Sequence, residues 1–388
     1  MIPPINKEAF MRRSFLAILA IGIILPTSLF AQVLSTPPSG DNQKSSVTQH
    51  IGLVKVTIDY NSPDVHAPNG EDRRGKIWGQ LVPYGMTDLG FGTCKECPWR
   101  AGANENTVFT VSHDVKIEGQ PLQAGKYGLH MIPEKDADWT VIFSKNHTSW
   151  GSFTYDAAED ALRVKVKPVK SEFHEWLTYD FVDRRNDKAT VAMKWEEVSV
   201  PFTIAVDDPT SLYLARIREE LRDSRGFTSQ NWVAAAQYAL QARRPADALY
   251  FAQQAVNPRF AGQENFQTLN TLASAQEAAG KTAEAKVNRE KAINHPSAGA
   301  LELHQYGRQL LTQGKKEEAL RIWELNAKRN PNVWPVHVGM ARGLSANGRY
   351  QDALKHARLA LAQAPDEGNK RSLEAGIKKL EEGKDMNQ

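Results

Sequence analysis

The sequence predicts a multidomain protein in which an all-β antiparallel sandwich is followed by an all-α solenoid of repeated helical hairpins. Two observations carry this prediction. Between residues 52 and 206 apolar residues alternate with polar ones, as in Val54, Val56 and Ile58, which is the period of a strand with one buried face. Past residue 208 the apolar period becomes helical, and the sequence begins to repeat itself.

The N-terminal segment, from Met1 to Ala31, has the pattern of a bacterial export signal. Basic residues precede an apolar run from residue 15 to residue 25, and Ala31 provides a small residue at a plausible cleavage point. A membrane anchor is the alternative, although the run is short for a span of about 20 residues and a proline ends it. Residues 32–50 are polar and rich in Ser and Pro, which predicts a disordered tether. We therefore expect an exported protein, periplasmic or secreted, without a stable membrane span after cleavage.

The charge balance and the motifs exclude several functions. The chain carries a net charge of +3, and most of this charge belongs to the predicted export signal, which holds Lys7, Arg12 and Arg13 against Glu8. The rest is close to neutral, so it lacks the basic surface that nucleic-acid binding needs. The sequence also has no G-x-S-x-G, H-E-x-x-H or phosphate-loop motif, which removes the commonest hydrolase and kinase routes. No cofactor is predicted.

The β half, residues 51–206, contains seven predicted strands. They cover residues 54–60, 107–112, 125–132, 139–144, 162–166, 177–181 and 190–195. Short strands at this spacing, separated by turns and without long helical windows, favour an antiparallel sandwich. Six tryptophans are expected to pack in its core, with a carbohydrate-stacking platform as the alternative. They are Trp78, Trp99, Trp139, Trp150, Trp176 and Trp195.

Residues 207–227 predict a helix that joins the two halves, and helical repeats follow over residues 228–383. Four windows align without gaps, and one alanine holds the same place in each. These alanines are Ala248, Ala285, Ala319 and Ala353, so the repeats follow one another at a nearly constant interval. With Gly314 and Gly348 at the turn between paired helices, this pattern resembles the tetratricopeptide repeat of about 34 residues. A polar terminal helix is expected to cover the last repeat.

Repeats of this kind stack into a solenoid whose first helices line a concave groove, so the expected partner is a protein or peptide. By repeat position, the groove-facing residues are Gln237, Ser274, Arg308 and Arg342, and His304 lies one helical turn before Arg308. Two neighbouring arginines favour an acidic side chain or a chain-terminal carboxylate. The alternative is that each arginine pairs with an acidic residue of a neighbouring repeat.

Cys94 and Cys97 are the only cysteines of the chain. In an exported protein we expect a disulfide between them. A zinc site is one alternative, but it needs two further ligands, and no two histidines of the β half have a close metal-binding spacing. A redox pair is the other, but such a pair normally opens a helix, whereas glycine and proline predict a loop here. The prediction is a structural staple and no metal site.

The segment WRAGANEN follows this pair and leads into a predicted strand. It places Arg100, Asn104 and Glu105 among small residues, which allow the backbone to approach closely. The cluster forms either a satisfied buried network or a ligand cradle. As candidate ligand-binding residues we take these three together with Trp78 and His130.

Six blocks of sequence resemble a known bacterial family. In order they are DVHAPNGEDRRGKIWGQLVPYG, PWRAGANEN, EGQPLQAGKYGLHMIP, WTVIFSKN, SWGSFTYD and ALRVKVKP. They are similar to the family called domain of unknown function 2911, which is often exported and sometimes followed by tetratricopeptide repeats. The resemblance implies a β-sandwich and no established reaction. The family pattern does not require the two cysteines, which favours a staple over a family-wide catalytic role.

Two functions remain open. The first is an exported adaptor, in which the sandwich recognises a small or glycan-like ligand and the solenoid recruits a protein. The alternative is a glycosidase-like hydrolase of the cell envelope. It would use Glu105 with Asp64 or Asp72 as second carboxylate, assisted by Arg100 or His130.

Overall fold

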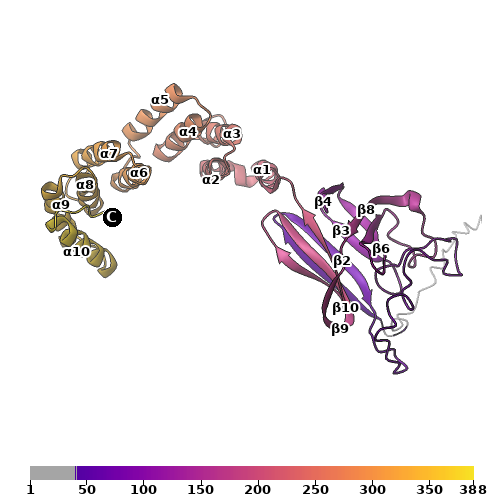
Figure 1. Ribbon diagram of the computed structural model, residues 1–388. Helices are drawn as coiled ribbons and strands as arrows, with labels where there is room; N and C mark the ends of the chain where they lie inside the picture. Colours follow the sequence, from indigo (N-terminus) through magenta and orange to yellow (C-terminus); the bar gives the residue numbers. More distant parts are fainter. Residues whose placement is uncertain (1–39, 41) are drawn as a thin grey trace, which may run out of the picture.

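The computed structural model describes residue 40 and residues 42–388. A β domain and an arch of helices are joined by helix α1 (Pro209–Glu220) (Figure 1). The predicted export signal lies outside the described residues, as do residues 32–39 of the predicted tether. Among the residues described, no helix has the length and apolar character that crossing a membrane requires.

The β domain is a sandwich of two antiparallel sheets. The larger sheet has the order β1 (Gln43–Ile51), β2 (Val54–Ser62), β3 (Thr107–Val111), β6 (Gly125–Ile132), β7 (Trp139–Ser144) and β8 (Asp160–Val166). The smaller has the order β5 (Gln120–Leu122), β4 (Val115–Ile117), β10 (Lys188–Ala205) and β9 (Val169–Arg184). Alternate side chains of both sheets form one core, as expected for period-two strands. Phe143 of β7 meets Phe202 of β10 edge to face, with ring centroids 5.9 Å apart.

The seven predicted strands are present, but the structure corrects the predicted tether. Residues 43–50 belong to β1, which pairs with β2 along its whole length. Most β1 side chains are exposed and only Ile51 is buried, so the strand contributes little apolar area. Backbone hydrogen bonds to a long neighbouring strand hold it instead, and composition does not reveal them. The tether prediction is therefore wrong for residues 43–50.

The tryptophans also divide differently from the prediction. Trp139 and Trp195 are buried in the core, and Trp78 and Trp99 pack against it. Trp150 and Trp176 are instead 54% and 40% exposed, so the prediction of core packing is wrong for these two. The exposure of Trp176 follows from strand alternation, because the next residue along β9, Leu177, faces the core.

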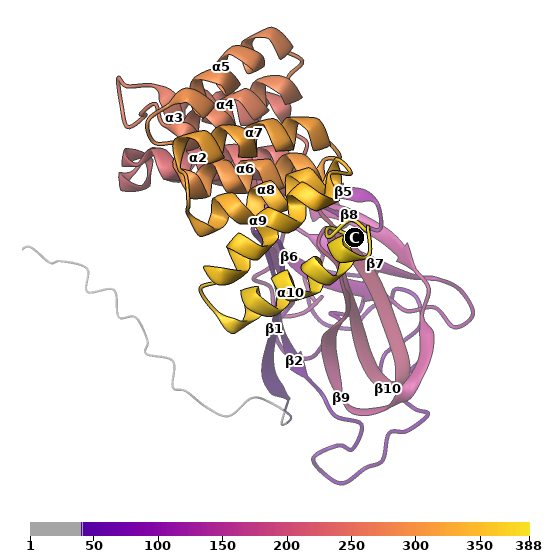
Figure 2. The ribbon, with the colours of Figure 1, turned by 90° about the vertical axis from the view of Figure 1, so that its left-hand side faces the viewer.

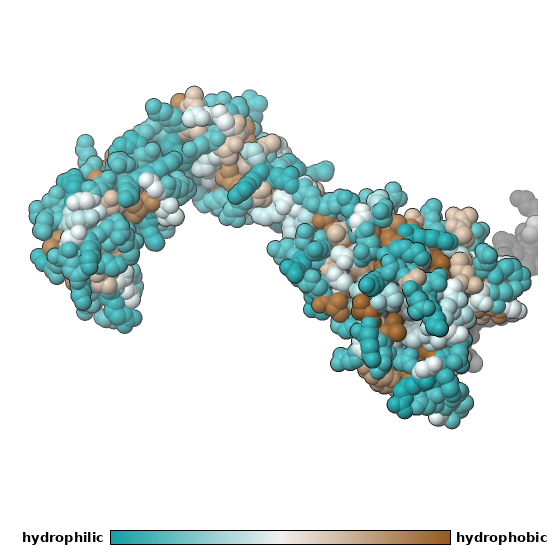
Figure 3. All heavy atoms as spheres, in the orientation of Figure 1, coloured by the Kyte–Doolittle hydropathy of each residue, from teal (hydrophilic) through white to brown (hydrophobic). Residues whose placement is uncertain are grey.

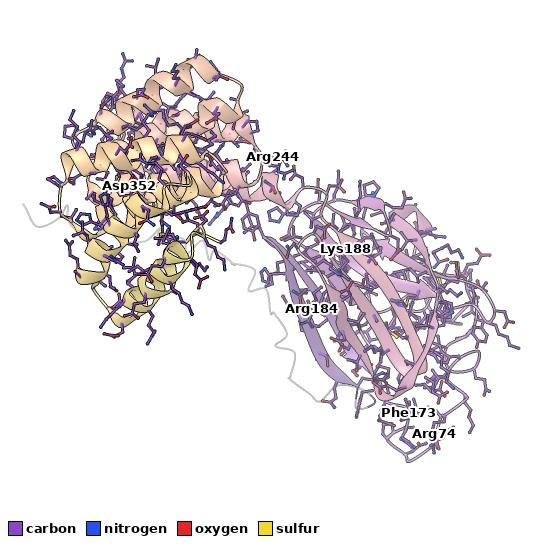
Figure 4. The ribbon with its side chains drawn as sticks, turned by 60° about the vertical axis from the view of Figure 1, so that its left-hand side comes forward. Arg74, Phe173, Arg184, Lys188, Arg244 and Asp352 are labelled. Atoms are coloured by element: carbon purple, nitrogen blue, oxygen red, sulfur yellow. A yellow bond between two sulfur atoms is a disulfide. The ribbon has the colours of Figure 1, made fainter. Side chains whose placement is uncertain are left out.

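The joint between the domains is held by polar contacts around the start of α1. Asp208 caps the helix by accepting a hydrogen bond from the backbone N–H of Ser211, and it forms an ion pair with Arg244, 2.5 Å between Oδ2 and Nη2. Figure 4 places Arg244 between the helices and the β domain. Leu212 packs against the sandwich core. The first helical hairpin is thereby tied to the end of β10.

The arch consists of four helical hairpins and a terminal helix. The hairpins are α2 (Ser229–Gln241) with α3 (Pro245–Val256), α4 (Phe266–Ala278) with α5 (Thr282–Asn294), α6 (Ala300–Thr312) with α7 (Lys316–Arg329), and α8 (Trp334–Ala346) with α9 (Tyr350–Ala362). The terminal helix is α10 (Glu367–Glu381), and Figure 2 shows the helices stacked in pairs. The four repeated alanines are all buried. This is the predicted tetratricopeptide-like solenoid.

The turns between paired helices explain the repeated glycine. Gly314 and Gly348 have φ of 78° and 77°, a left-handed conformation that glycine adopts without strain. In the first repeat Arg243 occupies the corresponding place with φ of 57°. The surface that the arch presents in Figure 3 is largely hydrophilic, because the apolar side chains of the paired helices face one another.

Candidate functional site

A cavity of about 300 Å³ opens in the β domain. Most of its wall comes from the long connection between β2 and β3. Its apolar lining includes Leu81, Trp99 and Trp195, and its polar lining includes Arg73, Arg100 and Ser152. None of the described residues that line the cavity is acidic. The site therefore combines indole surface with positive charge.

Arg100 is the best-defined polar group of the cavity. Its Nη1 donates to the carbonyl oxygen of Asn104 at 2.6 Å, and its Cζ lies 4.9 Å from the ring centroid of Phe153. The guanidinium group lies against Gly151, where a Cβ atom would overlap it. Burial lowers the pKa of Arg100, and none of the described carboxylates forms an ion pair with it. One hydrogen bond leaves most of its five N–H donors unused within the described part of the chain.

The loop that carries Arg100 is tied to the sandwich on both sides. The backbones of Trp99 and Met131 exchange two hydrogen bonds of 2.8 Å, and the N–H of Ala103 donates to the carbonyl of Asn61. Ala101 has a φ of 50°, and its carbonyl accepts from Tyr179 Oη at 2.8 Å. These bonds hold the loop in place, so Arg100 is presented by a fixed backbone.

Two of the predicted ligand-binding residues lie behind the cavity wall. His130 is 2% exposed, and its Nδ1 lies 3.1 Å from the Oγ of Ser152, which does line the cavity. Burial, with a smaller effect of nearby Arg100, lowers the pKa of His130 to about 4, so it is neutral at pH 7. Trp78 packs edge to face against Trp99 and Trp195. Both residues support the wall and do not line the cavity.

Glu105 does not line the cavity. Its Oε1 is 3.1 Å from Lys44 Nζ, and its Oε2 accepts from Asn61 Nδ2 at 2.8 Å. Burial acts to raise the pKa of Glu105, but a backbone hydrogen bond, Lys44 and Asn61 outweigh it and lower the pKa overall. The backbone oxygen of Asn104 accepts the hydrogen bond from Arg100. The predicted cluster is thus split between a polar network at the sheet edge and the cavity.

The second carboxylates considered for a hydrolase lie elsewhere. Asp72 accepts hydrogen bonds from the side chain and backbone of Arg74, which hold the pKa of this carboxyl well below its usual range. Asp64 forms a backbone bridge with Trp176 at the start of the long connection. Neither aspartate lines the cavity, and nor does Glu105. The structure does not bring a carboxylate pair to this cavity.

Cys94 and Cys97 form the predicted disulfide, with 5.7 Å between their Cα atoms. The backbones of Cys97 and Thr87 exchange hydrogen bonds of 2.9 and 3.1 Å, and both residues line the cavity. The bond therefore staples a part of the cavity wall. In the described part of the chain no three His, Cys, Asp or Glu side chains are grouped as metal ligands.

A second candidate site lies on the inner side of the arch, where Figure 1 shows α6 and α8 with the C-terminus beside them. His304 and Arg308 of α6 lie beside Arg342 of α8, and we call these three residues the arginine cluster. His304 is 6% exposed, and burial together with both arginines lowers its pKa to about 4. Burial and Arg308 also lower the pKa of Arg342. Within residues 42–388, Arg308 forms no ion pair with a carboxylate.

The last residues of the chain fold back onto this cluster. Ser345 Oγ donates to Asp385 Oδ1 at 2.7 Å, and the N–H of Met386 donates to Ser345 Oγ at 2.9 Å. Arg342 Nη1 donates to Asn387 Oδ1 at 3.3 Å, and Asn387 Nδ2 donates back to the Arg342 carbonyl at 3.0 Å. A short segment of the chain itself, which contains Asp385 and Asn387, thus lies against part of the arginine cluster.

The other two predicted groove residues do not join the cluster. Ser274 donates to the carbonyl of Asn270 at 3.0 Å and accepts from Arg289 Nη1 at 3.2 Å. It lines a separate, polar cleft of about 890 Å³ between the second and third hairpins, together with Arg289 and Tyr306. Gln237 is exposed on α2. The structure therefore gathers three of the five predicted residues.

Comparison with known proteins identifies the β domain. Residues 42–204 match the model of the family described as protein of unknown function, DUF2911. The β domain is therefore similar to the DUF2911 family over nearly its whole length, and we call it the DUF2911 domain. No curated protein matches the chain. The sandwich, the cavity and the disulfide described above all belong to this DUF2911 domain, and the helical arch follows it.

Solved structures of repeat proteins are similar to part of the chain. MamA shows 15% identity and a TM-score of 0.28, with 39% of this chain and 85% of MamA covered. YrrB, described as a TPR protein with an unusual peptide-binding site, shows 17% identity and a TM-score of 0.28 over 42% and 81%. The C-terminal part of a TPR repeat-containing protein from Cytophaga hutchinsonii shows 11% identity and a TM-score of 0.33 over 44% and 66%.

Sequence reasoning missed several residues of the DUF2911 cavity. Arg73 and Leu81 lie in an irregular connection, where no periodicity predicts the direction of a side chain. Trp195 and Trp99 were recognisable in the sequence as large aromatic residues, but core packing was favoured over the alternative of a carbohydrate-stacking platform. No sequence pattern marked Ser152 as a cavity residue. It reaches the cavity because the segment that follows β7 returns to the loop that carries Arg100.

Proposed function

We propose that this protein is an exported two-part adaptor. The helical arch holds an acidic segment of a partner protein, and the DUF2911 domain holds a small ligand in its cavity. The observation that carries the first half is the arginine cluster, where guanidinium groups from adjacent repeats lie close enough for Arg308 to lower the pKa of Arg342. A carboxylate placed between them would relieve that repulsion and accept charge-assisted hydrogen bonds.

The folded-back C-terminal segment supports the proposal, because it brings polar side chains, one of them a carboxylate, close to Arg342. Asp385 lies near Arg342, and the amide of Asn387 bonds both its guanidinium group and its carbonyl. A partner segment with an acidic side chain or a terminal carboxylate would find matching donors there. Arg308 has no carboxylate partner in the described residues and is exposed, which leaves it available.

Export is part of the proposal and rests on the sequence from Met1 to Ala31. The disulfide between Cys94 and Cys97 supports it, because such bonds persist in oxidising compartments. Export predicts that the protein purified from its own cell envelope begins close after Ala31, which N-terminal sequencing measures. An intact N-terminus in the cytosolic fraction would contradict this part.

The test of the adaptor reverses the charge of the cluster. Affinity capture from envelope extract with the Arg308→Glu, Arg342→Glu double variant is expected to lose a partner that the unchanged protein retains. The matched control is Arg321→Glu with Arg358→Glu, which removes two exposed arginines from the second helices of hairpins. Equal recovery of partners by both double variants would show that the arginine cluster is not the binding site.

A further inference from the structure

We propose that the cavity of the DUF2911 domain binds a small organic anion, whose charged group contacts Arg100 and whose apolar body lies against Trp99 and Leu81. This inference rests on the proposed function, which makes the cavity a ligand site. It adds the chemical class of the ligand.

The charges around the cavity carry the first step. Arg73 and Arg100 both line it, and within the described part of the chain no acidic side chain lines it and neither arginine forms an ion pair. Their neighbour Arg74 differs, since it is neutralised by Asp72 with 2.6 Å between Nη2 and Oδ2. A guanidinium group drawn partly out of water without a counter-charge is costly. An anion in the cavity would supply the missing charge.

The geometry of Arg100 carries the second step. Its side chain is held by the Asn104 carbonyl on one side and by the Phe153 ring on the other. Gly151 provides the space for the guanidinium group, since any larger residue would overlap it. The loop beneath is anchored by hydrogen bonds on both sides. A planar fork held this way suits the paired oxygens of a carboxylate or phosphate and loses little freedom on binding.

The apolar lining carries the third step. Trp99 and Trp195 stack at 6.2 Å between ring centroids with their planes 17° apart, and both line the cavity. Leu81 adds an apolar side chain that is half exposed. Indole surface of this kind favours a flat or hydrophobic ligand body. A volume of about 300 Å³ is at the lower end for ligand sites and indicates a molecule of about one ring in size.

The experiment compares three probes that differ only in their polar group. Benzoate, phenyl phosphate and neutral benzamide are titrated into the full chain, with calorimetry and tryptophan fluorescence as readouts. We expect at least one of the two anions to bind and benzamide to bind about tenfold more weakly or not at all. The better anion then distinguishes a carboxylate ligand from a phosphate ligand.

Variants separate the site from general electrostatic attraction. Arg100→Gln is expected to weaken anion binding about tenfold or more, and Arg73→Gln, which leaves the Arg100 contacts intact, to weaken it by a smaller factor. Arg74→Gln removes the same charge one residue away from Arg73 and is the matched control, with unchanged affinity. Figure 4 places Arg74 at the tip of the β domain farthest from the helices.

Two results would overturn the inference in different ways. Benzamide binding as tightly as benzoate, with all three variants unaffected, would refute the anionic class and leave a ligand site in place. Failure of all three probes to bind at millimolar concentration would refute the cavity as an anion site. Partner capture by the arginine cluster would test the adaptor independently of both results.

Discussion

Lowering the pH from 7 to 5 is expected to destabilise the β domain through His130. This histidine is buried beneath the cavity wall, where its pKa is about 4 against an ordinary value of 6.5. Above pH 6.5 it is neutral in both the folded and the unfolded chain, so it has no effect on stability. As the pH falls below 6.5, His130 binds a proton in the unfolded chain but stays neutral in the folded domain. The free energy of unfolding therefore decreases until about pH 4.

The size of the effect follows from the two pKa values. Linkage gives a loss of about 2 kcal/mol between pH 7 and pH 5 for this one group. Carboxylates with lowered pKa, such as Glu105, lose their contribution mainly at lower pH, since their unfolded pKa is about 4.3. The interval from pH 7 to pH 5 therefore reports chiefly on histidine.

Hydrogen exchange measured by mass spectrometry on peptides from β6 and β7 isolates this domain within the full chain. The His130→Gln variant cannot take up the proton, so its protection should change much less between the two pH values, whatever constant cost the substitution brings. His50→Gln replaces an exposed histidine of the same domain and should keep the full pH dependence. The reasoning is refuted when His130→Gln loses as much protection as the unchanged protein.

Two further predictions concern the two candidate sites. Deleting residues 384–388 is expected to tighten the binding of an acidic peptide to the arginine cluster about three- to tenfold, because the folded-back segment no longer competes with the peptide. Asp385→Asn should give a smaller gain in affinity. Fluorescence anisotropy with a labelled peptide measures both affinities, and an unchanged affinity in the deletion variant would contradict the competition. Gly151→Ala and Gly70→Ala each place a side chain at a positive φ and should cost about 1 kcal/mol or more in urea unfolding. Only Gly151→Ala displaces Arg100, so benzoate binding should weaken in this variant alone. An equal loss of benzoate binding in both variants would show that Arg100 is not part of the anion site.

The elements of this protein were predictable because their signals are local. Alternation along residues 54–60 and 139–144 marks strands, since a strand sends successive side chains to opposite faces. The recurring alanine and glycine mark hairpins, because two helices must approach closely and then turn. Such patterns need only a few neighbouring residues. They failed for β1, whose stability comes from backbone pairing with β2 and not from its own composition.

The candidate sites were only partly predictable, and particular residues show why. Arg308 and Arg342 occupy equivalent repeat positions, so the sequence alone could place them side by side. Arg100 and Glu105 are near neighbours in the sequence, yet they face different surroundings, because the loop that carries them is bonded to two different strands. No spacing rule expresses that separation.

The sequence by itself therefore determined the two-domain architecture, the helical repeat, the favoured disulfide between Cys94 and Cys97, and the equivalent repeat positions of Arg308 and Arg342. Only the tertiary structure decided which polar groups face a cavity. Arg100 is positioned at the cavity by Phe153 and Gly151, which lie beyond β7 in the sequence. Its charge is not neutralised there, because none of the described acidic side chains lines the cavity. Contacts between distant segments depend on how whole sheets pack, and the apolar period within one strand cannot predict these contacts.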